Sequence, residues 1–121
     1  MLWPLPAPEL SPNARVMWWQ RALLTKKYKQ DCGYIAQDAA RGTVGLPWAG
    51  AVVRVQWRVT DPGRRRDRDN ALASIKAGLD SLSGVIVRDD STLRPEFVEP
   101  FFVKVPPRQE GVWLEIAEVP G

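Results

Sequence analysis

A chain of 121 residues with 45% hydrophobic residues and six tryptophans is long enough for one folded domain and too short for two. It contains no histidine, which excludes histidine general bases, Ser-His-Asp triads and the usual zinc sites. The net charge is only +3, but residues 1–88 carry 14 Lys and Arg against 7 Asp and Glu, whereas residues 89–121 carry 3 against 7. A basic body with an acidic C-terminal portion indicates a polyanionic partner that meets one face.

No segment is typical of a membrane span or a leader. The longest uncharged run, residues 42–53, contains a proline and three glycines and is far shorter than the roughly 20 apolar residues of a membrane helix. The N-terminal segment has no basic region and is interrupted by prolines, so we expect no signal peptide. A single cysteine, Cys32, cannot form an internal disulfide, which fits a reducing compartment, and we expect it to be structural. The chain is therefore expected to be soluble and cytoplasmic.

The first half of the chain predicts a strand, a helix and a second strand. Residues 2–6 are expected to form an edge strand, because prolines do not suit a central one. A turn at residues 10–13 leads into a predicted helix over residues 14–40, and residues 41–50 read as a glycine-rich loop. Over residues 51–60 the side chains alternate, which predicts a half-buried strand with an open basic face. The apolar face would carry Val53, Val55, Trp57 and Val59, and the basic face Arg54, Gln56 and Arg58.

The second half predicts one more helix and two more strands. After a turn at residues 61–63, a helix is expected over residues 70–83, followed by Gly84 and a short extended piece. Strands are expected at residues 97–105 and 112–119, joined by a Pro106-Pro107 turn. The whole order predicts a single α/β (α+β) domain over residues 1–121, in which two helices pack against a small mixed sheet.

Between the central strand and the second helix lies the stretch RRRDRDN, residues 64–70, which mixes four arginines with two aspartates. On a helical wheel, Lys76 and Asp80 fall within about 40° of Asp69, and Asp67 sits in the entry loop. Asp89-Asp90, after the helix, is a second source of carboxylates. In the absence of histidine, such carboxylates favour Mg²⁺ or Mn²⁺, which can activate water and offset charge on a scissile phosphate.

The basic residues of this region have matching roles in that interpretation. Lys76 could stabilise the phosphate or the leaving oxyanion. Guanidinium groups match phosphate oxygens in a bidentate fashion, so the arginines could hold neighbouring phosphates. The residues concerned are Arg64, Arg65, Arg66 and Arg68.

A purely structural interpretation uses the same residues. Asp67, Asp69 or Asn70 can cap a helix N-terminus, where short polar side chains accept from free amides. Asp89-Asp90 can form a turn, and Lys76 can be a surface lysine that pairs with Asp80 at i, i+4. Spacing alone leaves both interpretations open.

The order of these residues resembles the RusA-type Holliday junction endonucleases, a family common in bacteriophages and prophages. The specific part comprises RRRDRDN, Lys76, the LDSL run at residues 79–82 and Asp89-Asp90, and the opening segment, with SPNAR at residues 11–15, also fits. The resemblance implies that Asp67, Asp69 and Asp90 bind metal and that Lys76 is the catalytic lysine. Some members place this lysine four residues after the second aspartate and not seven, a difference of about one helical turn.

The resemblance further implies Mg²⁺ dependence, with Mn²⁺ as a substitute, and a homodimer that makes paired nicks across a four-way DNA junction. A nuclease acting on flaps or forks is the alternative among enzymes. A module that binds DNA junctions without cutting is the alternative from another class, and the presence of all three aspartates and a lysine argues against it.

Aromatic residues add expectations about contacts. Trp57 is expected in the core, and Trp113 is a candidate for the same position. Trp18 and Trp19 are helix neighbours that cannot both face one core, so one of them is expected at a dimer contact or near DNA. Of the pair Phe101-Phe102, one is expected to be buried between subunits.

Overall fold

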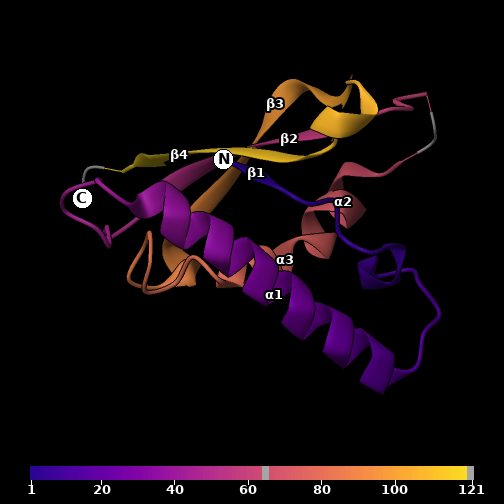
Figure 1. Ribbon diagram of the computed structural model, residues 1–121, viewed down its shortest axis with the longest axis horizontal. Helices are drawn as coiled ribbons and strands as arrows, with labels where there is room; N and C mark the ends of the chain where they lie inside the picture. The colour runs from indigo at the N-terminus through magenta and orange to yellow at the C-terminus, as the bar shows by residue number, and fades with distance from the viewer. Residues whose placement is uncertain (64–65, 120–121) are drawn as a thin grey trace.

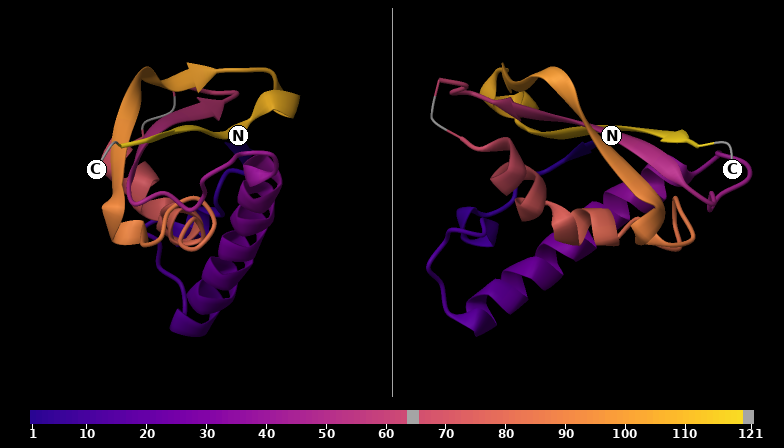
Figure 2. Two further views of the ribbon diagram at one scale, coloured as in Figure 1. Left: turned by 90° about the vertical axis from the view of Figure 1, so that its left-hand side faces the viewer. Right: turned by 180° about the vertical axis from the view of Figure 1, so that it is seen from behind.

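The computed structural model describes residues 1–63 and 66–119, which form a mixed four-stranded sheet with three α-helices on one side of it (Figure 1 and Figure 2). The expected combination of a small mixed sheet and helices is thereby confirmed. In chain order the elements are β1 (Leu2–Trp3), α1 (Trp18–Ala40), β2 (Ala51–Val59), α2 (Arg68–Ser74), α3 (Lys76–Asp80), β3 (Leu93–Lys104) and β4 (Gly111–Glu118). Short 3₁₀ turns at Pro8–Leu10, Asp90–Thr92 and Pro107–Gln109 connect them.

The sheet has the order β1-β4-β2-β3, so β2 lies between β4 and β3. β4 runs antiparallel to β2, β3 runs parallel to it, and β1 pairs with β4 at one edge. The apolar face predicted for β2 is confirmed, because Val53, Val55, Trp57 and Val59 are all buried. β1 is an edge strand as expected, although it ends at Trp3 and not at residue 6, and β3, which contains two prolines, occupies the other edge.

The core lies between the sheet and the helices. α1 contributes a narrow stripe of Tyr28, Cys32 and Ala36, spaced four residues apart. Burial raises the pKa of the Cys32 thiol to about 12, so the expectation of a structural cysteine is consistent with its surroundings. The Tyr28 hydroxyl donates to the Pro4 carbonyl at 2.8 Å and ties α1 to the segment that follows β1.

The predicted helix over residues 70–83 is wrong in its continuity and its bounds. α2 begins at Arg68, two residues earlier, and ends at Ser74, and α3 ends at Asp80. The chain bends at buried Ile75, whose φ of −99° and ψ of 8° are not helical. After the bend, Gly78 of α3 packs closely against Trp3 of β1 and Cys32 of α1.

Smaller differences also have physical reasons. α1 begins at Trp18 and not at residue 14, because the Arg21 side chain donates to the carbonyls of Ser11 and Ala14 and holds that segment as a turn. β3 begins four residues before the predicted position 97. Residues 85–87 form no strand, although Val87 makes isolated bridges to Trp48 and Ser83.

One aromatic expectation is corrected. Trp113 pairs with Gln56 across the strands, so it lies on the open face and is half-buried under the Arg58 guanidinium, 5.1 Å from the ring centroid. Phe101 is buried inside this chain, with 1% of its surface exposed, whereas Phe102 is partly buried, so the expected contact between subunits would fall to Phe102 and stays a prediction. The two helix neighbours Trp18 and Trp19 are 79% and 48% exposed, so neither belongs to the core.

No helix in the described part of the chain combines the length and apolar character needed to cross a membrane.

Candidate metal and nucleic-acid site

Asp67 is the N-cap of α2. Its Oδ1 accepts the backbone N–H groups of Asp69 at 2.8 Å and Asn70 at 3.2 Å, which otherwise lack partners in the first helical turn. The structural interpretation of this residue is therefore confirmed. A cap uses one carboxylate oxygen, and Oδ2 makes no hydrogen bond with any described residue, so capping and ligation are compatible.

Asp69 occupies the first turn of α2 and is exposed. A negative side chain is favourable there because it faces the positive end of the helix dipole. Asp67 and Asp69 therefore form one pair of accessible carboxylates at the start of α2, directly after the arginine run.

A second acidic group surrounds the end of α3. The Lys76 Nζ lies 3.4 Å from Asp80 Oδ1, so the i, i+4 pair considered from the sequence is present. The Asp80 carboxylate also lies beside Asp90, and this interaction, followed by desolvation, raises the pKa of the Asp90 carboxyl. Asp89 caps the next turn by accepting from the Ser91 backbone N–H at 3.0 Å, which lowers its pKa, and its carboxylate also interacts with Asp90.

The structure thus brings Lys76, Asp80 and Asp90 together at one end of the α2–α3 segment, and Asp67 and Asp69 at the other. In residues 1–63 and 66–119, no three acidic or cysteine side chains gather closely enough to hold one metal ion. A site shared by Asp67, Asp69 and Asp90 stays a prediction. The sequence indicated Asp80 only as a surface partner of Lys76, although its place on the same helical face was a usable signal.

Each of the two acidic groups contains a pair of carboxylates, which is the number that Mg²⁺ commonly takes from a protein. Mg²⁺ usually keeps several waters and takes one or two protein carboxylates together with substrate phosphates. The raised pKa of Asp90 beside Asp80 reflects crowding of acidic groups, which a bound cation relieves. Asp67 Oδ2 and Asp69 provide a second pair of oxygen donors.

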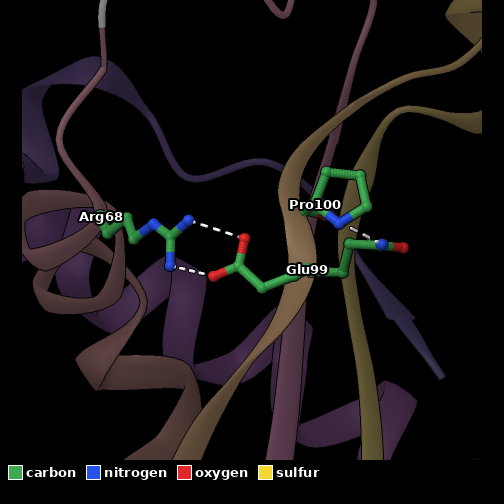
Figure 3. Close-up of polar contacts among 4 residues, drawn as sticks. Arg68, Glu99 and Pro100 are labelled. Atoms are coloured by element: carbon green, nitrogen blue, oxygen red, sulfur yellow. Dashed lines mark hydrogen bonds and ion pairs between the residues drawn. The ribbon is translucent and has the colours of Figure 1, made fainter.

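The arginines of RRRDRDN make different contacts. Arg64 and Arg65 lie outside the described residues. Arg66 donates to the Asp61 carbonyl and lies over the Phe102 ring, with 5.9 Å from its Cζ to the ring centroid. Arg68 forms two hydrogen bonds with the Glu99 carboxylate of β3 (Figure 3).

The Arg68–Glu99 contact perturbs both groups. The hydrogen bonds to Glu99 raise the pKa of Arg68, and the same bonds lower the pKa of Glu99. Sequence reasoning missed Glu99 because it lies 31 residues from Arg68, and no local pattern connects a helix start with a strand so far along the chain.

A hollow of about 520 Å³ opens beside the start of α2. Its apolar wall includes Trp57 and Val59 of β2, and its polar lining includes Asn13, Arg66, Asp67 and Asn70. Ligand pockets commonly combine an apolar wall with a few convergent polar groups, and this hollow has both beside Asp67.

No protein-family model, curated protein or solved structure matches this chain. What the chain does is therefore inferred from its own residues.

Proposed function

We propose that the protein is a Mg²⁺-dependent, structure-specific DNA endonuclease that resolves Holliday junctions by paired symmetric nicks. The observation that carries this proposal is the α2–α3 segment, which follows the arginine run directly. It has accessible carboxylates at both ends, and Lys76 stands with Asp80 and Asp90 at the end away from Asp67 and Asp69. Its support from sequence is the resemblance to RusA-type endonucleases over the same residues. The lack of histidine leaves oxygen ligands as the main donors for a metal.

In this proposal Asp67, Asp69 and Asp90 hold the metal. Bound Mg²⁺ supplies a Lewis acid that activates water and offsets charge on the scissile phosphate. Sharing one ion would require Asp90 to approach Asp67 and Asp69, because in the described residues no three such side chains lie close enough to hold one metal ion.

Lys76 contributes the positive charge beside Asp80 and Asp90. Its ammonium, now paired with Asp80 and 74% exposed, can exchange that carboxylate for a phosphate oxygen because an exposed ion pair is weak. Water adds to phosphorus, the bond from phosphorus to the 3′ oxygen breaks, and that oxygen takes a proton. The products are a 5′-phosphate and a 3′-hydroxyl.

In this proposal the three arginines before Asp67 bind the DNA backbone beside the cleaved phosphate. Arg64, Arg65 and Arg66 precede Asp67 directly and would hold phosphates on either side of the cleaved one. A four-way junction has two-fold symmetry, so a homodimer would present one site to each of two related phosphates.

The deciding experiment is cleavage of a synthetic four-way junction with Mg²⁺ by wild type and Asp69→Asn. We expect wild type to cut, and the variant to bind the junction but cut at least about 100-fold more slowly, since even outer partners of a metal site are worth roughly 10- to 100-fold. Asp38→Asn is the matched control, because Asp38 lies in α1, is exposed and pairs only with Arg41 in the described chain. It should cut like wild type.

Other outcomes would change the assignment. Binding without cutting in either Mg²⁺ or Mn²⁺ would establish a junction-binding module. Equal cutting of linear duplex would end the claim of junction specificity, and preferential cutting of flaps or forks would establish the alternative nuclease. Sedimentation velocity on the free protein tests the dimer.

A further inference from the structure

β3 carries a bulge opposite the middle of β2. Val55 pairs with Phe97 and Trp57 pairs with Phe102, so the stretch between these two phenylalanines has more residues than β2 opposes. The Gln56 side chain fills part of this gap by donating to the Pro100 carbonyl at 3.1 Å. Bulges beside functional sites re-aim side chains, and here the bulge directs Glu99 toward the start of α2 (Figure 3).

Three residues of the bulge and its flanks, Glu99, Phe97 and Phe101, contact the Arg68 side chain and are together called its seat. Arg68 Nη2 donates to Glu99 Oε2 at 2.7 Å, while Nη1 donates to Oε1. The Cζ atom lies 5.5 Å from the Phe97 ring centroid and 5.8 Å from that of Phe101. A bidentate carboxylate and two aromatic rings use the planar guanidinium in a way that a lysine could not reproduce.

The seat fixes the backbone that carries the proposed metal ligands. Arg68 stands between Asp67 and Asp69, and it is the first residue of α2, whose cap is the Asp67 side chain. Holding the Arg68 side chain on β3 therefore limits rotation of the α2 start relative to the sheet. A misplacement of about 1 Å at such a site can cost roughly 100-fold in rate.

We propose that Arg68 is a positioning residue, which Glu99 and the β3 bulge hold in place, and that it does not grip DNA phosphate as its neighbours in the arginine run do. The role of Asp67 and Asp69 in this inference rests on the proposed function. The seat itself does not, because it consists of contacts within the chain.

The two roles of Arg68 predict opposite effects of Glu99→Gln. If Arg68 positions α2, then Arg68→Gln and Glu99→Gln break the same contact, have effects of the same sign, and the double variant is no worse than either single one. If Arg68 binds phosphate, Glu99 competes for it, so Glu99→Gln tightens junction binding while Arg68→Gln weakens it.

The first measurement is amide hydrogen exchange of Asp69 and Asn70, whose N–H groups bind Asp67. Both single variants should speed this exchange, with no further increase in the double variant and partial recovery in Arg68→Lys. The matched control is the pair Arg54–Glu96 on β2 and β3, 3.8 Å apart and exposed, whose Gln variants should leave the exchange unchanged. Unchanged exchange in Arg68→Gln would overturn the positioning role.

The second measurement is junction cleavage and binding as a function of salt. We expect kcat to fall on the order of 10-fold or more in both single variants, with an unchanged dependence of binding on salt. A salt slope reduced by about 1 in Arg68→Gln, together with tighter binding by Glu99→Gln, would show a phosphate contact and refute the inference. The exchange measurement needs no DNA, so it tests the seat even if the protein cuts no junction.

Discussion

Gly78 shows how one residue joins three elements. A Cβ built on it would lie 2.8 Å from Trp3 Cζ3 and 2.9 Å from Cys32 Sγ, closer than carbon can approach either atom. The glycine is needed for this approach and not for its backbone angles, since its φ is not positive. Such a contact lets α3 lie directly on α1 and β1, and it helps to set where Lys76 and Asp80 stand.

Two glycine variants test this close packing, because they should change the free energy of unfolding in opposite directions. Gly78→Ala should lower the free energy of unfolding by about 1–3 kcal/mol, because neither the Trp3 ring nor the Cys32 thiol has room to move in the core. Gly33→Ala should raise it by roughly 0.5–1 kcal/mol, since Gly33 lies inside α1 and its new Cβ would be an ordinary 3.6 Å from Ser81 Cβ. Urea unfolding measures both, and equal effects would contradict the packing argument.

At the scale of elements, the α2–α3 pair depends on a cap and a bend. Asp67 satisfies two N–H groups at the start of α2, and the bend at Ile75 turns α3 toward α1. The β3 bulge then fixes α2 from the other side through Glu99. The segment that carries the proposed chemistry is therefore held from three directions, although α2 has only seven residues and α3 only five.

Substitution of Asp67 separates its cap from its proposed metal role. Asp67→Ala should destabilise the fold by about 1 kcal/mol, whereas Asp67→Asn should be nearly neutral because asparagine caps helices as well as aspartate does. Thermal unfolding measures this difference. Both variants should lose junction cleavage if Asp67 is a ligand, since an amide lacks the charge that a divalent cation requires. Full cleavage by Asp67→Asn would reduce Asp67 to a cap.

At the scale of the whole molecule, the shortest strand has the largest buried side chain. Trp3 lies in two-residue β1, yet it is fully buried and touches Gly78 of α3. The core is thus a single cluster that extends from the edge strand through the helices to β2. α1, by contrast, buries only three residues, and its N-terminal turns expose Trp18 and Leu23.

Trp3→Ala should therefore lower the global free energy of unfolding by roughly 3–5 kcal/mol. Its indole N–H has no hydrogen-bond partner in the described chain, so removing it leaves no unpaired acceptor that would add to this cost. Trp18→Ala is the control and should change stability by less than about 0.5 kcal/mol, because 79% of Trp18 is exposed. Coincident loss of far-ultraviolet circular dichroism and tryptophan fluorescence would confirm one cooperative unit. A small effect of Trp3→Ala would mean that β1 frays independently.

Local patterns predicted what depends on neighbours in sequence. The alternation in β2 and the run of α1, in which Gly33 is the only breaker, act within one or two turns of the chain, so sequence alone determined β2 and most of α1. The sequence also offered Asp67 as one of three candidate caps, although the predicted helix began two residues after the observed start of α2. Tertiary structure decided the rest. The bend at Ile75, the outward Trp113, the contact of Asp80 with Asp90 and the seat of Arg68 on Glu99 all depend on partners brought together by packing. The burial of distant surfaces determines which of these partners meet, and no periodicity in the sequence records it.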